Sequence, residues 1–502
     1  MALSSRFWRL NLFPKPSLSP LQTTLKSLKP LRQKLCPILS LPISSSSSSL
    51  NSSNSLFSTS KNSAFSEPHS RTPSPQDDLI VLGIETSCDD TAAAIVRGNG
   101  EILSQVVSSQ ADLLAQYGGV APKMAEEAHL QVIDKVVQEA LDKAKLTETN
   151  LSAVAVTIGP GLGLCLRGHR FEESSKFGVR KAREIAGSCN LPIIGVHHME
   201  AHALVARLTE RELQFPFVAL LISGGHNLLI LARDLGQYVQ LGTTIDDAVG
   251  EAYDKTAKWL GLDLRRSGGP AIEELAREGD AKSVKFSTPM KQHKDCNFSY
   301  AGLKTQVRLA IESKNIDLWS AILAINFYPP NFPMLCSNTT IPLSSASSED
   351  RRIRADIAAS FQRVAVLHLE ERCERAIEWA LKIEPSVKHL VVSGGVASNQ
   401  YVRSRLDQVV KKNSLQLVCP PPCLCTDNGV MVAWTGIENF CMGRFDPPPP
   451  ADEPEDIVYE LRPRWPLGEE YAEGRSEARS MRTARMHPSL TSMIQESLQQ
   501  QP

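Results

Sequence analysis

Three short apolar segments of the sequence each run directly into a polar turn, and this recurrence limits the possible folds more than any other feature. The segments are residues 79–84, 217–222 and 389–392, and Ser-Gly-Gly follows closely on the last two. A short apolar run that ends in a turn predicts a buried strand. Glycine in such a turn allows positive φ and a close approach of the backbone to a phosphate. The repetition predicts two related α/β halves that face each other across a nucleotide-binding cleft.

The turn after the first segment is the most polar of the three. It reads Glu-Thr-Ser-Cys-Asp-Asp-Thr at residues 85–91, and the apolar residues 92–96 predict the return strand of a β-hairpin. Hydroxyls and acids between two buried strands suit a phosphate or metal-phosphate site, and an ordinary polar hairpin turn is the structural alternative. A Gly/Pro-rich turn at residues 157–163 leaves a similar choice between anion binding and a tight connection.

Three histidines, His197, His198 and His202, follow the apolar residues 191–196. In a helix, His198 and His202 are one turn apart on the same face, so both imidazoles can bind one metal ion. Histidines also occur with satisfied hydrogen bonds at strand ends, so the pair alone does not decide between the two interpretations. We assign His197 to a cap on the preceding strand or to support of the metal ligands.

Acidic residues in two other places are candidates for the same site. Asp247, Glu251 and Asp254 fall on one face of a predicted helix. A solvated acidic face is the usual explanation, and a role in ligand binding requires that face to point inward. Asp427 precedes the apolar residues 430–434, and it is predicted to be the N-cap of a helix, a third metal ligand, or both.

The first 75 residues differ in composition from the rest of the chain. They are rich in serine, leucine and proline, carry scattered lysine and arginine, and contain no acidic residue before Glu67. Such a segment cannot bury a core, and its composition is typical of an organellar transit peptide rather than of a disordered regulatory tail. The Leu-Phe-Ser-Thr-Ser stretch at residues 56–60 favours the mitochondrion over the chloroplast.

The remaining composition is that of a globular protein with two or three domains. The chain has 502 residues, of which 42% are hydrophobic, and a formal net charge of -1. This balance argues against a protein that coats nucleic acid but allows a local basic surface. The 11 cysteines are odd in number and scattered, so we expect reduced thiols rather than a disulfide framework. No run of about 18 apolar residues predicts a membrane-spanning helix.

Together the motifs resemble, in their order along the chain, those of the tRNA N6-adenosine threonylcarbamoyltransferase family. The resemblance covers residues 79–467, and with its leader the chain is similar to the plant mitochondrial form. The motifs, as they stand in this sequence, are ETSCDDT, YGGVAPKMAEEAH, GPGLGL, HHMEAH, LLISGGH, DDAVGEAYDK, FSYAGLK, SGGVASN, CTDNG and RPRWPL.

The resemblance implies a fold and a division of the chain. The implied fold is α/β, with two actin/sugar-kinase/Hsp70-like domains around a nucleotide cleft. The first domain would span residues 79–215 and the second residues 216–467, whose C-terminal part can return to the first. Residues 1–75 would be the transit peptide and residues 468–502 a tail.

The resemblance also implies a site and its ligands. His198, His202 and Asp427 would bind one divalent metal ion per subunit, either iron or zinc. The implied substrates are threonylcarbamoyl-AMP and tRNA, and the implied assembly is a homodimer without accessory subunits. Substrate contacts are implied at Leu221, Ile222, Ser223, Gly224, Gly225, Asp254, Gly269 and Asn399.

The implied reaction transfers the threonylcarbamoyl group to N6 of the adenosine 3′ of the anticodon, in mitochondrial tRNAs that read codons beginning with A. An adenine amine is a weak nucleophile, so the acyl carbonyl must be polarised, as a metal ion can do. We predict that Asp89 or Asp90 accepts the proton of the amine.

Two other functions compete with this interpretation. Zinc proteases of the His-Glu-x-x-His type carry their glutamate directly after the first histidine. Here Glu200 lies two residues after His198, about 200° around a helix, and should point away from a metal ion. The other alternative is an inactive ATP-binding assembly subunit, and the three intact ligand positions count against it.

Two segments interrupt the family pattern. Residues 168–177 separate two halves of a region that the family connects almost directly, so they would bulge or break a helix of the first domain. Residues 318–340 are unusually apolar for a surface loop. If the first segment is part of the folded domain, we expect it to lower stability.

Overall fold

The computed structural model describes five stretches of the chain, which are residues 76–110, 122–161, 177–314, 342–452 and 460–474. The predicted transit peptide lies outside the described residues. Residues 168–176 and 318–340 of the two interrupting segments, and the tail beyond residue 474, also lie outside them.

The first sheet has the strand order β3-β2-β1-β4-β5. Its strands β1, β2 and β3 form an antiparallel meander, whereas β4 and β5 run parallel to β1. The predicted hairpin is confirmed, with Glu85 paired to Ala92 across its turn. The strands are β1 (Ile80–Glu85), β2 (Thr91–Arg97), β3 (Ile102–Ser108), β4 (Ala153–Gly159) and β5 (Ile193–His197).

The second sheet has the order β10-β9-β6-β7-β8-β11. Strands β6, β7 and β8 form its antiparallel meander, and β9 and β10 run parallel to β6. The strands are β6 (Phe217–Ile222), β7 (Asn227–Asp234), β8 (Gln237–Thr243), β9 (His389–Ser393), β10 (Gln416–Val418) and β11 (Glu469–Glu470).

The two sheets repeat one topology. Read from its antiparallel side, β8-β7-β6-β9-β10 has the same connectivity as β3-β2-β1-β4-β5. The predicted fold class, two α/β halves of the actin/sugar-kinase/Hsp70 type, is therefore confirmed, and β1 and β6 are equivalent strands. Leu221 of β6 pairs with Ser393 of β9, so the two Ser-Gly-Gly turns leave the second sheet at the same end.

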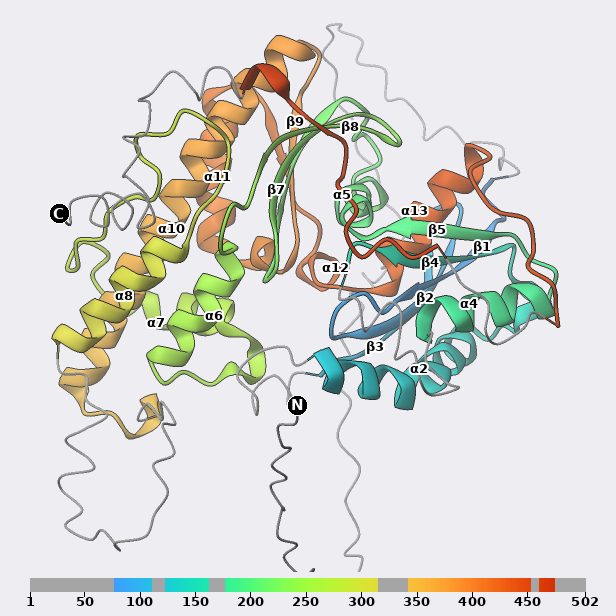
Figure 1. Ribbon diagram of the computed structural model, residues 1–502, viewed down its shortest axis with the longest axis horizontal. Coiled ribbons are helices and arrows are strands. Elements are labelled where there is room, and N and C mark those ends of the chain that lie inside the picture. Colours follow the sequence, from blue (N-terminus) through green and yellow to red (C-terminus); the bar gives the residue numbers. More distant parts are fainter. Residues whose placement is uncertain (1–75, 111–121, 162–176, 315–341, 453–459, 475–502) are drawn as a thin grey trace, which may run out of the picture. The chain divides into compact units, whose positions relative to one another are not determined.

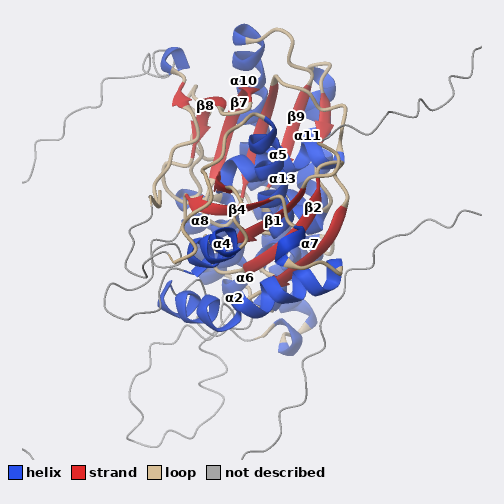
Figure 2. Cartoon of the chain, turned by 90° about the vertical axis from the view of Figure 1, so that its right-hand side faces the viewer, coloured by secondary structure: helices blue, strands red, loops and turns tan. Residues whose placement is uncertain are grey.

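Helices cover both faces of the first sheet (Figure 1; Figure 2). Leu82 and Val154 point into a core shared with α2 and α4, whereas Val81 and Ala153 point into a core shared with α5 and α13. This alternation is the period of two that a β-strand imposes on its side chains. The helices are α2 (Pro122–Ala144), α4 (Phe177–Ser188), α5 (His198–Thr209) and α13 (Gly429–Cys441).

Helix α13 packs on the first sheet although it follows β6 to β10 of the second sheet in the sequence. A Cβ atom on Gly83 of β1 would lie 2.3 Å from the backbone nitrogen of Ala433 and from the carbonyl oxygen of Gly429. Only glycine allows the helix to lie this close to the strand. The residues just before α13, which include Asp427, are thereby held against the first half.

The second sheet packs one face against a larger group of helices. Val218, Leu220 and Ile222 share their core with α10, the longest of the described helices. No helix in the described residues is long and apolar enough to cross a membrane. The helices of this half are α6 (Val249–Trp259), α7 (Gly268–Ala276), α8 (Ala301–Ser313), α10 (Ser348–Ile383), α11 (Gln400–Lys412) and the short α12 (Pro422–Cys425).

Candidate metal centre and substrate site

Helix α5, which carries the two histidines, lies between the two sheets. Ala201 and Val205 belong to the core of the first sheet, whereas Met199 and Ala203 pack against the second. Most of the helix is buried, including its polar residue Glu200. A helix that is packed on opposite sides cannot roll, and the directions of its histidine side chains are therefore fixed.

His197 caps this helix and is not a member of the histidine cluster. Its Nδ1 accepts hydrogen bonds from the backbone N–H groups of Met199 (3.1 Å) and Glu200 (3.4 Å), and its Nε2 donates to the carbonyl of Trp465 (3.0 Å). The predicted cap on the preceding strand was thus placed on the wrong element. The side chain satisfies the free N–H groups of the first helical turn, which the strand does not have.

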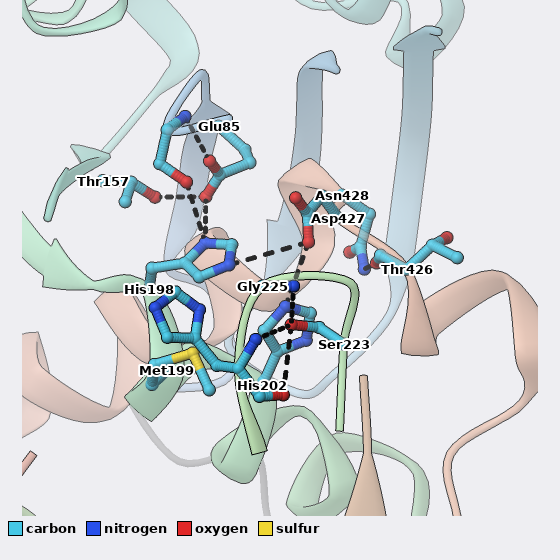
Figure 3. Close-up of polar contacts among 12 residues, drawn as sticks. Glu85, Thr157, His198, Met199, His202, Ser223, Gly225, Thr426, Asp427 and Asn428 are labelled. Atoms are coloured by element: carbon cyan, nitrogen blue, oxygen red, sulfur yellow. Dashed lines mark hydrogen bonds and ion pairs between the residues drawn. The ribbon is translucent and has the colours of Figure 1, made fainter. Parts of the chain in front are cut away.

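His198, His202 and Asp427 come together as the sequence suggested (Figure 3). The Nε2 atom of His202 lies 3.0 Å from Oδ1 of Asp427, and the Nε2 atom of His198 lies 3.7 Å from the same oxygen. The potential ligand atoms of the three residues all lie within 4.8 Å of one another. The i,i+4 spacing on α5 brings the imidazoles together, with ring centroids 4.7 Å apart.

Asp427 does not cap α13. The N-cap is Asn428, whose side-chain oxygen accepts a hydrogen bond from the backbone N–H of Met431 at 2.9 Å. The Asp427 carboxylate instead faces His198 and His202. The neighbouring residue supplies the cap in place of Asp427.

Glu85, at the end of β1, is a member of the site that the sequence reasoning missed. Its side chain is fully buried, and its Oε2 lies 3.2 Å from Nδ1 of His198. Thr157 donates its hydroxyl to Oε2 at 2.5 Å, and the backbone N–H of Ser87 donates to Oε1 at 2.6 Å. A single acid that ends an otherwise apolar strand is the signal that could have identified it.

The charges of the cluster depend on each other. Burial alone would raise the pKa of Glu85, but the charge and hydrogen bond of His198 outweigh it and lower that pKa. Burial likewise opposes ionisation of Asp427, yet the two histidines bring its pKa down to about 2. Burial lowers the pKa of His198, whereas Glu85 and Asp427 raise it to about 9. The buried Glu85 and the partly exposed Asp427 therefore surround a position that favours positive charge.

The residues present fit a divalent cation. Ligand atoms about 2.0 to 2.2 Å from a tetrahedral ion lie roughly 3.4 Å apart, and the distances of 3.0 and 3.7 Å to Asp427 lie on either side of that value. Two imidazoles and one carboxylate are suitable donors for iron or zinc. Glu85 would hold the proton on Nδ1 of His198 and leave Nε2 free to bind, as carboxylates commonly do behind metal-bound histidines.

A further residue that the sequence reasoning missed is a histidine near the cluster. His226 directly follows the first Ser-Gly-Gly turn. Burial lowers the pKa of His226, and the charge of His198 lowers it further while Asp427 acts in the opposite direction. Its ring therefore lies within electrostatic reach of the candidate metal ligands, and it joins the second sheet to the site.

The turn between β1 and β2 is held by a buried histidine from α2. The Nε2 atom of His129 donates to the carbonyl oxygen of Cys88 at 3.0 Å, so its Nδ1 accepts from the hydroxyl of Thr91 at 2.7 Å. These bonds fix both ends of the stretch that contains Asp89 and Asp90. The two carboxyl groups are thus presented by a turn with a defined position.

Both carboxyl groups of that turn are less acidic than usual. Burial raises the pKa of Asp89, and the charge of Asp427 adds to the effect. Burial, then the charges of Asp89 and Asp427, raise the pKa of Asp90 to about 7. Each of these carboxyl groups therefore lies close enough to Asp427 to interact with it, and Asp90 can exchange a proton near neutral pH.

The equivalent turn of the second sheet offers its backbone. Leu221 and Ile222 are fully buried in β6, so neither residue exposes atoms to a ligand in this structure. Ser223 closes the turn on itself, because its hydroxyl accepts from the N–H groups of Gly225 (3.3 Å) and His226 (3.1 Å). A Cβ atom added to either glycine of this turn would have no neighbouring atom within 4 Å, so space remains beside the main chain.

The remaining predicted contacts fall in two places. Asp254 of α6 accepts a hydrogen bond from the backbone N–H of Gly268 at 2.7 Å, which brings it beside the open backbone of Gly269. Asn399 instead has a structural role. Its side-chain oxygen caps α11 by accepting from Val402 N–H at 3.0 Å, and its amide donates to Gln362 at 3.1 Å. Its side chain thus has only part of its hydrogen-bonding capacity left for a ligand.

The acidic face predicted for residues 247–254 is paired with neighbouring groups in the structure. Lys304 of α8 lies 2.9 Å from Oδ2 of Asp247 and 3.4 Å from Oε1 of Glu251. The solvated face that this spacing usually indicates is thus only partly exposed, because α8 packs beside α6 and brings a lysine to it.

Comparison with known proteins decides the family. The family model of TsaD, described as tRNA N6-adenosine threonylcarbamoyltransferase, matches residues 101–434. The chain belongs to this family. A protein of Arabidopsis thaliana named "Probable tRNA N6-adenosine threonylcarbamoyltransferase, mitochondrial" is 66% identical over 502 residues, which are 100% of this chain and 98% of that protein.

More distant members of the family cover most of the chain as well. The mitochondrial enzyme of Xenopus tropicalis is 41% identical, over 72% of this chain and 83% of its own length. A tRNA N6-adenosine threonylcarbamoyltransferase of Rhizobium etli is 41% identical, over 77% and 94% of the two chains. The family resemblance is confirmed, and so is the mitochondrial localisation, which the names of two of these relatives carry.

Proposed function

We propose that the protein is a tRNA N6-adenosine threonylcarbamoyltransferase of mitochondria that uses threonylcarbamoyl-AMP as its donor. The acceptor is N6 of the adenosine 3′ of the anticodon in tRNAs that read codons beginning with A. A new carbon–nitrogen bond forms between the carbamoyl carbon and N6. The bond between the carbamoyl carbon and the phosphate oxygen breaks, and AMP leaves. The observation that carries the proposal is the cluster of His198, His202 and Asp427 in a chain of this family.

The first half of the molecule supplies the residues that would hold a metal ion. His198, His202 and Asp427 offer ligand atoms within 4.8 Å of one another, and Glu85 orients His198 from behind. A bound iron or zinc ion would supply Lewis acidity for the carbamoyl carbonyl or the phosphate. Because α5 is packed between both sheets, these side chains need little reorganisation to receive it.

The second half supplies a cradle for the adenylate. The N-terminus of α6 lies on the Ser-Gly-Gly turn, where the backbone N–H of Gly250 donates to the carbonyl of Ser223 at 3.2 Å. The open main chain at Gly224 and Gly225 and the positive end of α6 together suit a phosphate. Asp254 and the neighbouring Gly269 would bind the hydroxyls and base of the same nucleotide.

The proton of the adenine amine needs an acceptor. Asp89 and Asp90 remain the candidates, because both lie within electrostatic reach of Asp427 and both have a raised pKa, which burial causes first. A carboxylate with a pKa near 7 accepts a proton more readily than an ordinary aspartate does. Of the two, Asp90 has the pKa of about 7.

The geometry disfavours a zinc protease. In such enzymes the glutamate next to the first histidine activates water at the metal ion. Here the carboxylate of Glu200 accepts a hydrogen bond from the hydroxyl of Tyr238 at 2.7 Å, in the core between α5 and the second sheet. A glutamate bonded in this way cannot act as a base at the candidate metal centre.

An assay of the purified chain tests the proposal. The chain, loaded with iron or zinc, is mixed with threonylcarbamoyl-AMP and with mitochondrial tRNAs that do or do not read codons beginning with A. We expect modified adenosine only in the first group, and none with the Asp427→Ala variant. Cleavage of a protein substrate without tRNA modification would contradict the proposal. ATP binding without either activity would identify an assembly subunit instead.

The same preparation tests the proposed assembly. We expect a homodimer that is active without accessory subunits, so sedimentation should give twice the mass of the mature chain. A monomer that is inactive until a mitochondrial extract is added would contradict this part of the proposal.

A further inference from the structure

An ordered basic loop connects α7 and α8, and the proposed reaction leaves it without a role. We define this basic loop as residues 280–295. Its four lysines are exposed, and none of them forms an ion pair or side-chain hydrogen bond with any other described residue. The lysines are Lys282, Lys285, Lys291 and Lys294.

Two arginines of α10 fix the C-terminal part of the basic loop. Arg372, which is 1% exposed, donates to the carbonyl oxygens of Met290 (2.8 Å), His293 (2.9 Å) and Asp295 (2.8 Å). Arg375 donates to the carbonyl of Asp295 as well. These bonds hold the main chain in one conformation, so the adjacent lysines are presented from a fixed backbone.

The N-terminal part is fixed by an earlier stretch of the same helix. The backbone N–H of Asp280 donates to Asp356 at 2.7 Å, and that of Val284 donates to Ser360 at 3.2 Å. Ala281, Val284 and Phe286 pack on the core of the second half, which leaves the intervening lysines on the outside.

The loop thus follows α10 over a considerable length (Figure 1). Its contacts extend from Asp356 to Arg375, which corresponds to roughly 30 Å along the helix axis at about 1.5 Å per residue. An array of cations of this length can follow several phosphates of an RNA backbone.

Two exposed lysines of α11, on the same half, are by contrast paired with acids. On α11, Lys411 lies 2.5 Å from Asp407, and Lys412 lies 3.0 Å from Glu374 of α10. Their exposure, 71% and 69%, shows that being on the surface does not prevent pairing. The basic loop is therefore a local concentration of uncompensated positive charge in a chain whose formal net charge is -1.

The basic loop leads back toward the candidate site. Directly after it, Phe298 forms a bridge to Thr244, next to the end of β8, and β8 pairs with the start of β7 beside His226. Ser299 donates its hydroxyl to Asp246 at 2.5 Å, and this bond also holds the chain after the loop close to the end of β8. Two strand spacings, about 10 Å, thus separate the end of this connection from the residue that follows the Ser-Gly-Gly turn.

We infer that the basic loop binds the sugar-phosphate backbone of the tRNA whose adenosine is modified, an inference that rests on the proposed function. The four lysines contact phosphates outside the modified nucleotide, and the arginines of α10 hold them in place. Phosphate contacts position a nucleic acid and contribute affinity that depends on salt, without reading its sequence.

Matched double variants test this inference. Lys282→Gln/Lys285→Gln and Lys291→Gln/Lys294→Gln each remove two charges from the basic loop. Lys411→Gln/Lys412→Gln removes two charges from α11 and is the control. For each protein, tRNA affinity is measured between 0.05 and about 0.3 M salt, together with KM and kcat for tRNA and the metal content.

We expect the loop variants to bind tRNA about tenfold more weakly near 0.15 M salt and to lose about 1.5 from the slope of log affinity against log salt. KM for tRNA should rise while kcat and metal content stay unchanged, which a general folding defect would not produce. The control should resemble the wild type. A loss in either loop variant beyond that of the control supports the inference.

Equal tRNA affinity in both loop variants and the control would overturn the inference and leave the proposed function intact, provided that the wild type modifies tRNA. If the wild type does not modify tRNA, the proposed function fails and the inference fails with it. Retained tRNA affinity combined with lost binding to vesicles of equal phosphatidylglycerol and phosphatidylcholine would also overturn it, and would assign the loop to a membrane surface.

Discussion

The turns after β1 and β6 occupy the same position in two sheets of the same strand order, but their chemistry differs. The first begins at the buried carboxylate of Glu85 and continues through Asp89 and Asp90, so it offers ionisable side chains. The second offers glycine backbone beside Ser223 and has open space around it. One duplicated framework thus presents acids and candidate metal ligands from one half and an open main-chain turn from the other.

This difference follows from the packing of each turn. The first is bonded to His198 of α5 and to His129 of α2, and buried carboxylates there must pair with cations or keep their protons. Among the described residues, the second is contacted by the N-terminus of α6, which brings N–H groups to it. We expect changes in the first half to act on metal and proton chemistry and changes in the second to act on nucleotide binding.

The largest expected effect distinguishes the role of the metal-site residues from that of the Ser-Gly-Gly turn. His202→Ala removes a ligand atom 3.0 Å from Asp427, so we expect metal content to be lost and kcat to fall at least about 100-fold. Ser223→Ala in the second turn should keep its metal and raise KM for threonylcarbamoyl-AMP. Metal analysis and steady-state kinetics of both variants check this, and loss of metal in Ser223→Ala would break the comparison.

A smaller effect is expected behind the metal ligands. Glu85→Gln keeps the shape of the side chain but removes the charge that holds the proton on Nδ1 of His198, so metal affinity should fall about 10- to 100-fold. Glu200→Gln is the matched control, because this buried acid lies on α5 but is bonded to Tyr238. Competition with a chelator measures both affinities. Equal affinities would show that Glu85 has no role at the metal centre.

In the second half, a larger side chain at the start of α6 should displace the Ser-Gly-Gly turn that is proposed to bind the adenylate. A Cβ atom on Gly250 would lie 2.5 Å from the carbonyl oxygen of Ser223, so Gly250→Ala should cost about 1 to 3 kcal/mol of unfolding free energy and raise KM for the adenylate. Gly302→Ala, where no atom lies within 4 Å of the new Cβ, is the control and should leave stability nearly unchanged. Denaturant unfolding measures the unfolding free energy of both variants, and equal values would contradict this prediction.

The smallest expected effect concerns the pH dependence of stability. Burial first, and then nearby acids, raise the pKa of Asp90 to about 7, so its ionisation destabilises the fold as pH rises from about 4 to about 7. Asp90→Asn should therefore be more stable than the wild type at pH 8, by on the order of 2 kcal/mol, and the gain should vanish below pH ~4.

Asp246, in the second half, is the control, because its pKa is shifted in the opposite direction to that of Asp90. Burial opposes its ionisation, but hydrogen bonds from Ser299 and Tyr300 outweigh burial and lower its pKa. Its contribution to stability is thus present above pH ~4 and is lost as the pH falls below that value. Asp246→Asn should destabilise the protein at pH 8. Melting curves in which both variants shift in the same direction would contradict the assignment of these charges.

Local sequence patterns were sufficient for several features. Alternating and apolar runs predicted the β1–β2 hairpin and the two related halves, because burial of a strand requires such runs. The four-residue spacing of His198 and His202 predicted their shared helix face. The order of the motifs identified the family that the relatives confirm.

Other features depend on contacts between residues far apart in the chain. Glu85 and His198 are separated by 113 positions, and His202 and Asp427 by 225, so no local pattern could show that they meet. The sequence also left open whether Asp427 caps α13, and the structure gives the cap to Asn428. Sequence by itself determined which segments become strands and helices, since periodicity encodes burial. Only the tertiary structure decided which polar groups share one buried space, because that depends on how α5 and α13 pack together on the first sheet.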